Sequence, residues 1–353
     1  MKNPQKRIFI PSILKIGKGE LSNLGQYLKS EEFSNVACFF SAGMEDIVGD
    51  IFYKSLKSKN IKVLHKDTID QIHIENVIHT AFRIPKNIDA LVGIGGGKAL
   101  DYSKYCAFVL DLPFISIPTS ISNDGFCSPN SALLVENKRQ TIKAKIPYGV
   151  IVDLGVLLTS PDSCIYSGIG DLISKVTASF DWKMAAEKGY ETFNDFANLI
   201  AYNTVTDVMS HQTFGVKSSV FQYHLANSLL MNGLSMEIAG SSRPASGSEH
   251  LISHAYDAVA SSPAMHGIQV GVATYLCSYL QNNQHDAVRN FLAVTGFFDF
   301  VLNYRLSKND FIEAIKLAPT IKENFYTILS VEGKIQEAIN FVNSDSIMLN
   351  LFD

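Results

Sequence analysis

The sequence predicts an α/β fold with two domains, an N-terminal domain built on a parallel sheet and a C-terminal domain built from helices. Its 353 residues are enough for two domains of ordinary size. Up to about residue 155, short apolar segments alternate with helical patterns, which is typical of a parallel sheet whose strands are joined by helices. Beyond Pro161, apolar residues recur at three- and four-residue spacing, which is the period of a helix.

Each expected strand is a short apolar segment that ends where turn-forming residues begin. The clearest helical patterns lie in the second half of the chain, at residues 195–209 and 216–234. We expect the boundary near residue 160, with domains of residues 1–160 and 161–353. The expected strands are residues 35–40, 61–64, 89–94, 113–117 and 148–154.

The composition excludes several classes of protein. The chain has 30 Lys and Arg against 34 Asp and Glu, so neither nucleic acid nor an anionic membrane surface is an expected partner. No export signal is visible, and no apolar stretch is long enough for a membrane span. The five cysteines are odd in number and never spaced as CxxC, so we expect neither a disulfide framework nor a cysteine zinc site. A cytoplasmic location is the simplest expectation.

A glycine-rich turn, residues 95–97, follows one of the buried strands and precedes a helical pattern. This arrangement is typical of a phosphate-binding turn, because the free N–H groups at the start of a helix face an anion. The turn departs from the dinucleotide fingerprint, which needs glycine where Lys98 stands, and from the P-loop, which needs Ser or Thr in place of Ala99. A tight connection without a ligand is the alternative, but three consecutive glycines cost conformational entropy and favour a ligand.

A loop rich in hydroxyl groups, residues 118–129, follows the next expected strand. Loops at the carboxyl ends of neighbouring parallel strands commonly line a ligand site. The same residue types also form ordinary turns, so the loop alone does not decide between the two interpretations. The candidate ligand-binding residues in it are Thr119, Ser120, Ser122, Asp124 and Ser128.

Three of the nine histidines, His250, His254 and His266, fall within seventeen residues. The first two share one face of a helix, but Leu251 stands where a metalloprotease HExxH helix has glutamate. Asp171, expected at a glycine-hinged helix start, would supply a third, anionic ligand. Two imidazoles and one carboxylate leave an open position, as in a catalytic zinc site. The alternative is that the histidines are partly exposed helix residues and that Asp171 caps a helix.

The order and spacing of these motifs resemble the superfamily of iron-containing alcohol dehydrogenases, glycerol dehydrogenases and dehydroquinate synthases. The resemblance covers about residues 90–275. Within the superfamily the chain is most similar to the sn-glycerol-1-phosphate dehydrogenases. The motifs that carry the resemblance are the glycine turn with Asp101 and Lys104, then residues 118–129, 167–174, 242–250, His254 and residues 266–267.

The resemblance implies a dinucleotide-binding first domain and a second, all-helical domain for metal and substrate, as in dehydroquinate synthase. It implies zinc-dependent, reversible reduction of dihydroxyacetone phosphate to sn-glycerol 1-phosphate with NADH or NADPH, serving phospholipid biosynthesis. A homo-oligomer is expected. The implied zinc ligands are Asp171, His250 and His266, and the implied catalytic residues are His254, Asp124 and Asp171. The implied cofactor-binding residues are Gly96, Gly97, Asp101, Thr119, Ser120, Ser122 and Ser128.

Several choices stay open within this interpretation. Iron-type members usually carry a fourth ligand four residues after the first, where this chain has Lys175, so zinc is preferred. Ser41 follows an expected strand at a place where an acidic residue would favour NAD, so NADP is a candidate alongside NAD. Arg243 and Lys145 are candidate cations for the substrate phosphate. Three alternative functions remain. The first is a dehydrogenase for glycerol, another polyol or another phosphorylated ketone, and the second is a dehydroquinate synthase-like lyase. The third is a non-catalytic nucleotide-binding or interaction protein.

Overall fold

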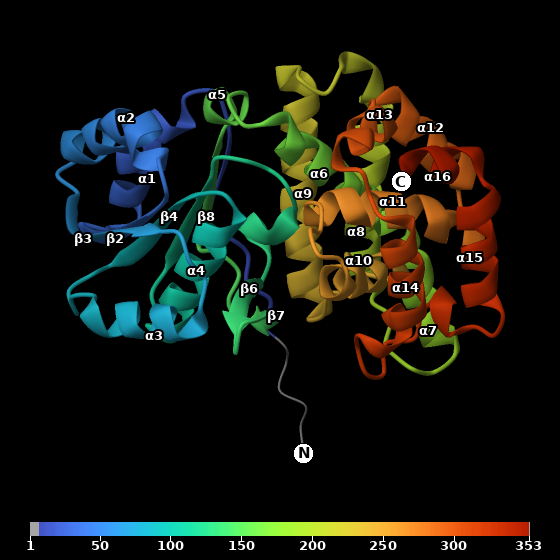
Figure 1. Ribbon diagram of the computed structural model, residues 1–353. Helices are drawn as coiled ribbons and strands as arrows, with labels where there is room; N and C mark the ends of the chain where they lie inside the picture. The colour runs from blue at the N-terminus through green and yellow to red at the C-terminus, as the bar shows by residue number, and fades with distance from the viewer. Residues whose placement is uncertain (1–6, 353) are drawn as a thin grey trace. The chain divides into compact units, whose positions relative to one another are not determined.

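The computed structural model describes residues 7–352. The chain divides into two compact units, of which the first ends at Pro161 and the second begins at Asp162. The first unit is built on a six-stranded parallel sheet with the strand order β1-β8-β5-β4-β2-β3 (Figure 1). The second unit is helical, so the predicted fold class is confirmed.

Five of the six parallel strands lie where the sequence predicts them, and β1 is additional. In β1 only Ile13 is fully buried, because the strand lies at the edge of the sheet and pairs with β8 alone. Its apolar signal is therefore weak. The strands are β1 (Ile13–Gly17), β2 (Asn35–Ser41), β3 (Lys62–Ile69), β4 (Ala90–Gly95), β5 (Phe114–Pro118) and β8 (Gly149–Asp153).

A two-stranded antiparallel hairpin, β6 (Asn130–Val135) and β7 (Lys138–Lys143), also lies in the first unit and was not predicted. Its two-residue turn consists of Glu136 and Asn137, which have φ angles of 50° and 62°. Tight hairpins need positive φ at both central positions, and Asn-Gly or Asp-Gly is the usual signal for them. Glutamate rarely adopts this conformation, so the turn went unrecognised.

Helices cover both faces of the parallel sheet, which makes the first unit a three-layer structure (Figure 1). Side chains of β2 alternate between the faces: Phe40 packs edge-on against Phe52 of one helical layer, and Phe39 packs against Tyr102 of the other. Because both faces are covered, the central strands are buried along nearly their whole length. The helices are α1 (Leu24–Ser30) and α2 (Met44–Ser58) on one face, α3 (Ile74–Arg83) and α4 (Gly97–Val109) on the other, and the short α5 (Leu154–Leu157) after β8.

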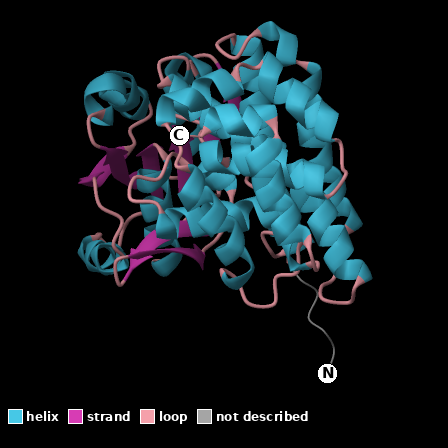
Figure 2. Cartoon of the chain, turned by 45° about the vertical axis from the view of Figure 1, so that its right-hand side comes forward, coloured by secondary structure: helices cyan, strands magenta, loops and turns pink. Residues whose placement is uncertain are grey.

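The second unit consists of helices joined by short turns, and its described residues contain no named strand (Figure 2). Both helical patterns expected in this half are confirmed, as α8 and α9. No helix in the described part of the chain is long and apolar enough to cross a membrane. The helices are α6 (Asp162–Ile173), α7 (Lys175–Glu187), α8 (Asp195–Ser210), α9 (Ser219–Ala239), α10 (Ser248–Val259), α11 (His266–Leu280), α12 (His285–Val294), α13 (Phe297–Val301), α14 (Lys308–Leu317), α15 (Lys334–Ser344) and α16 (Ser346–Leu351).

Candidate metal centre

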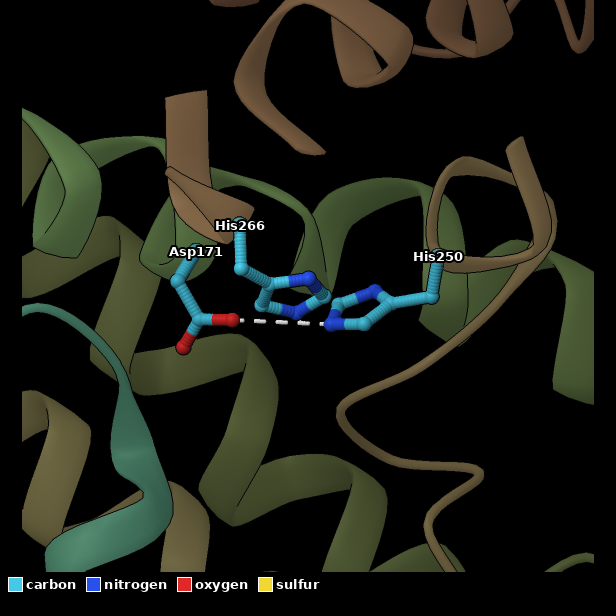
Figure 3. Close-up of side chains that lie close together, drawn as sticks. All are labelled: Asp171, His250 and His266. Carbon is cyan, nitrogen blue, oxygen red and sulfur yellow. Dashed lines mark ion pairs between the residues drawn. The ribbon is translucent and has the colours of Figure 1, made fainter. Parts of the chain in front are cut away.

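Asp171, His250 and His266 come together in the second unit. One ligand atom from each lies within 4.8 Å of those of the other two, and the carboxylate and both rings face one another (Figure 3). The Asp171 carboxylate lies 3.5 Å from Nε2 of His250. The side chains of Asp171 and His250 are only 1% and 7% exposed. Burying a carboxylate and an imidazole is costly unless they have partners.

Three helices supply these side chains: Asp171 lies in the last turn of α6, His250 near the start of α10, and His266 at the start of α11. The expectation that Asp171 lies at a glycine-hinged helix start is wrong. Gly170 lies inside α6, where a Cβ would come within 1.9 Å of the carbonyl oxygen of Gly267 on α11. Gly170 therefore does not act as a hinge. It allows the backbones of α6 and α11 to come into direct contact.

The contact between α6 and α11 involves the residues next to two of the candidate ligands. A Cβ on Gly267 would lie 1.9 Å from the carbonyl oxygen of Ser167, so neither glycine can be replaced without moving a helix. Gly170 directly precedes Asp171, and Gly267 directly follows His266. The distance between the carboxylate and the second imidazole is consequently set by direct backbone contact.

Glu249 fixes the orientation of the His250 ring. Its Oε1 lies 2.8 Å from Nδ1 of His250 and also accepts from the backbone N–H of Gly247 at 2.6 Å. Its Oε2 accepts from the Thr177 hydroxyl at 2.7 Å. A carboxylate beside Nδ1 holds the hydrogen there and leaves Nε2 as the nitrogen for ligation. Sequence analysis did not single out Glu249, although its place beside a candidate ligand was the available signal.

The orientation of the His266 ring is fixed by a series of hydrogen bonds that begins at Ser253. Its Nδ1 lies 3.0 Å from the Ser253 hydroxyl, which donates to Oε1 of Gln269 at 2.8 Å. The amide of Gln269 is itself held, because its nitrogen donates to Asp257 and to the carbonyl oxygen of Ala264. Since the hydroxyl donates to the amide oxygen, it accepts from Nδ1–H of His266, and Nε2 becomes the nitrogen for ligation.

Lys175 lies one turn after Asp171, with its ammonium 3.3 Å from the Asp171 carboxylate and 2.7 Å from the Asp171 carbonyl oxygen. Burial by itself would raise the pKa of Asp171. Lys175, followed by the two imidazoles, outweighs burial and holds that pKa well below its usual range. Asp171 is therefore ionised, as a ligand must be.

These observations fit a metal ion of the zinc type. Ligands around a tetrahedral zinc lie about 3.4 Å apart, given zinc–nitrogen and zinc–oxygen distances of about 2.1 Å. Burial would lower the pKa of His250, but Asp171 and Glu249 outweigh it and raise that pKa. The two carboxylates therefore favour positive charge at this position. Nitrogen and oxygen donors of this kind suit zinc and its neighbours in the first transition series.

His254 lies on the same face of α10, one turn after His250. Its ring centroid is 6.4 Å from that of His250 and 5.5 Å from that of His266, and it is nearly parallel to the latter. Its side chain is partly exposed, whereas His250 is buried. His254 thus lies beside the three-residue cluster without belonging to it.

The glycine turn joins β4 to α4 at the carboxyl edge of the parallel sheet. Gly95 has a φ of 149°, and a Cβ there would lie 2.0 Å from Oγ of Ser41, so the position requires glycine. Ser41 also accepts from the backbone N–H of Gly96 at 3.1 Å, which ties the end of β2 to the turn. A Cβ at Gly97 would meet nothing within 4 Å, so the first turn of α4 has open space beside it.

The loop after β5 lies at the same edge and is tied to α4 through Lys104. The buried ammonium of Lys104 donates to the carbonyl oxygens of Gly125 and Asn130, each at 2.6 Å, and lies 3.3 Å from Asp101. Burial raises the pKa of Asp101, although the charge of Lys104 opposes this effect. The other candidates occupy this loop: Thr119, Ser120, Ser122 and Asp124, with Ser128 bonded to the carbonyl oxygen of Asn130. The sequence-predicted nucleotide residues are therefore gathered at one edge of the sheet.

The two candidate cations for a substrate phosphate, Lys145 and Arg243, both have partners within the protein. Lys145 pairs with Asp111, which precedes β5 and so lies at the amino edge of the sheet, opposite the glycine turn. Arg243 is buried, bonded to Glu191 at 2.6 Å and to the carbonyl oxygen of Tyr326 at 2.9 Å. Its guanidinium also stacks on Phe325. Nη2 of Arg243 is buried without a hydrogen-bond partner among the described residues. Both residues therefore stay predictions for the phosphate site.

Comparison with known proteins agrees with this arrangement. A family described as iron-containing alcohol dehydrogenase matches residues 15–161. The glycerol-1-phosphate dehydrogenase of Thermococcus sibiricus, named as using NAD(P)+, is 34% identical over 325 residues, which cover 91% of each chain. That of Metallosphaera sedula is 34% identical over 336 residues, covering 92% of this chain and 93% of its own. The chain belongs to the glycerol-1-phosphate dehydrogenase family.

As a member of the glycerol-1-phosphate dehydrogenase family, the chain is an enzyme of the dehydrogenase kind. The fold is shared more widely. The glycerol dehydrogenase of Schizosaccharomyces pombe superposes with a TM-score of 0.80 over 99% of this chain and 92% of its own, at 18% identity. A probable glycerol dehydrogenase from Sinorhizobium meliloti superposes with a TM-score of 0.74 over 96% of this chain and 99% of its own, also at 18% identity.

Proposed function

We propose that this enzyme catalyses the zinc-dependent, reversible reduction of dihydroxyacetone phosphate to sn-glycerol 1-phosphate with NADH or NADPH. The observation that carries the proposal is the cluster of Asp171, His250 and His266, in which neighbouring groups direct both Nε2 atoms to ligation. Its relatives named glycerol-1-phosphate dehydrogenase supply the substrate and the type of cofactor.

The residues of the cluster have separate tasks in this proposal. Asp171, His250 and His266 hold the zinc ion, which when bound supplies a Lewis acid for the oxygen at the reacting carbon. Glu249 and the Ser253–Gln269 pair keep the two rings oriented. Lys175 keeps Asp171 ionised. A set of three protein ligands is typical of catalytic rather than structural zinc sites.

The first unit binds the nicotinamide dinucleotide, with residues 1–160 as the dinucleotide domain and residues 161–353 as the metal and substrate domain. The open space beside Gly97 and the N-terminus of α4 suit a pyrophosphate, which needs close backbone approach and free N–H groups. Ser41 ends β2 without a carboxylate, so neither nucleotide meets a negative charge from that residue. The remaining contacts come from Gly96, Asp101, Thr119, Ser120, Ser122 and Ser128.

His254 or Asp124 carries the proton to or from the substrate oxygen, through a hydroxyl group or water. His254 is the nearer candidate within the second unit, since it lies one turn from His250 on the same face of α10. A general acid or base is recognised by the pH dependence that it controls. If His254 has this role, His254→Gln lowers kcat and removes one limb of the pH–rate profile; a merely orienting role changes KM instead.

The test is cofactor oxidation with dihydroxyacetone phosphate and, in parallel, unphosphorylated dihydroxyacetone, on chelator-stripped and zinc-reloaded protein. The proposal expects zinc-dependent turnover of the phosphorylated ketone and its loss in His250→Asn. Preference for the unphosphorylated ketone would identify a glycerol dehydrogenase instead. Release of inorganic phosphate from a sugar phosphate without net cofactor oxidation would identify the lyase. A homo-oligomer and a cytoplasmic location remain predictions; size-exclusion chromatography with light scattering tests the first.

A further inference from the structure

A second group of metal-ligating side chains lies in the helical unit, apart from the proposed active site. It consists of Asp207, His211 and His224, whose nearest ligand atoms lie within 4.8 Å of one another. We propose that these three residues form a second site for a divalent transition metal of the zinc type, which clamps the end of α8 to α9. The proposal does not depend on the reaction that the enzyme catalyses.

The fold places the three side chains side by side. Asp207 and His211 are four residues apart at the end of α8, so they occupy the same face of that helix. The chain then reverses through the short 3₁₀ turn Gln212–Phe214 and Gly215, whose φ is 75°. α9 returns along α8, which brings His224 opposite the other two.

Nδ1 of each imidazole faces Asp207. Nδ1 of His224 lies 2.7 Å from the Asp207 carboxylate. Nδ1 of His211 lies 3.8 Å from the same carboxylate and 2.7 Å from the carbonyl oxygen of Asp207. The candidate ligand atoms are therefore the two Nδ1 atoms and a carboxylate oxygen, and an ion there would replace the hydrogen that His224 shares with Asp207.

The spacing needs only small side-chain movements to accept a cation. The Asp207 carboxylate lies 2.7 Å from Nδ1 of His224 and 3.8 Å from Nδ1 of His211. These separations lie on either side of the roughly 3.4 Å between neighbouring ligands of a tetrahedral zinc. All three side chains are between one-fifth and two-fifths exposed, so they can rotate and an ion can reach them from solvent.

Charge favours a cation at this position. Between Lys188 and Arg243 the sequence contains only one lysine or arginine, Lys217, and its ammonium pairs with Asp162 at 2.8 Å. Among the described residues, Asp207 pairs with the two imidazoles, whereas Asp171 pairs with the ammonium of Lys175. Two imidazoles and one carboxylate select zinc, nickel or copper over magnesium and calcium, which prefer oxygen ligands alone.

The experiment counts metal ions on the full-length protein. Chelator-stripped protein is titrated with zinc, excess metal is removed, and bound zinc is measured per chain. We expect two equivalents in the wild type and one in His224→Asn. The matched control, His79→Asn, alters an exposed histidine on α3 in the other unit and should keep two. His250→Asn, which changes the proposed active site, should keep the α8–α9 equivalent.

A second readout keeps the result interpretable. Zinc should raise the melting temperature of His250→Asn but not that of the double variant His250→Asn/His224→Asn, whose helical circular dichroism must match that of the single variant. Equal zinc content in the wild type and in His224→Asn overturns the second site, whether or not the proteins are active. One equivalent lost in His224→Asn with no reductase activity in any variant supports the second site while the proposed reaction fails.

Discussion

Replacing Gly267 by alanine tests whether the contact between α6 and α11 sets the geometry of the metal centre. The new methyl carbon would start 1.9 Å from the carbonyl oxygen of Ser167. Real contacts of this kind are not shorter than 3.0 Å, so one helix must move by at least about 1.1 Å. Metal–ligand distances tolerate only about 0.2 Å. Because His266 directly precedes Gly267, it moves with the helix.

We expect Gly267→Ala to weaken zinc binding at least tenfold, a loss of about 1.4 kcal/mol in binding free energy. Overpacking also lowers the free energy of unfolding by about 1–3 kcal/mol. Zinc affinity is measured by competition with a chromophoric chelator, and stability by urea unfolding of the metal-free protein. Both measurements are needed, because only a loss of zinc affinity in a variant that is still folded shows that the ligand geometry has changed.

The matched control is Gly49→Ala, which also changes a glycine inside a helix. A Cβ at Gly49 would lie 3.4 Å from its nearest neighbour, a side-chain carbon of Glu45, so nothing has to move. This variant should keep its zinc affinity and gain about 0.5–1 kcal/mol in stability. Wild-type zinc affinity in folded Gly267→Ala would refute the idea that backbone contact sets the ligand separation.

Three further predictions concern single side chains. Glu249→Gln removes the charge that orients His250, so zinc affinity should fall by about 10–100-fold; an unchanged affinity in the chelator assay would show that the ring needs no such partner. Ser41→Asp adds a carboxylate beside the glycine turn, and the ratio of kcat/KM for NADH over NADPH should rise at least about tenfold, since like charges repel a 2′-phosphate; a constant ratio would place the ribose elsewhere. Burial, followed by the charge of Glu249, raises the pKa of Asp181 to about 7. Between about pH 4 and pH 7 the folded chain keeps the proton of Asp181, whereas the unfolded chain has lost it. The contribution of Asp181 to the free energy of unfolding therefore falls as the pH rises through this range. Asp181→Asn should lack this part of the slope in urea unfolding of the zinc-loaded protein, and identical slopes would contradict the assignment.

Patterns in the sequence predict the central strands because those strands are buried on both faces. Buried parallel strands are continuous apolar segments, as in β4. The edge strand β1 and the β6–β7 hairpin have mostly partly or fully exposed residues, so their apolar signal is diluted. The hairpin turn at Glu136 also lacks the residues that usually mark it. Tertiary pairing, rather than local preference, decides these elements.

The sequence also predicts which side chains could form the metal centre, but not what holds them. Histidine spacing places His250 and His254 on one helix face, and the structure confirms this. The contribution of Gly170 was misread as a hinge, because a glycine in a sequence does not reveal whether it bends the chain or admits a neighbouring backbone. Partners distant in sequence, such as Thr177 for Glu249, depend on helix packing that no local pattern encodes.

Lys175 has a consequence for how the proposed metal centre would be filled. Removing a lone carboxylate from water is costly, and small zinc domains that rely on the ion to neutralise their ligands do not fold without it. Here the ammonium neutralises Asp171 within the chain itself. The polypeptide is therefore expected to complete its folding before it receives an ion. If the proposed zinc site is correct, the supply of metal would govern how many molecules are active rather than how many are folded.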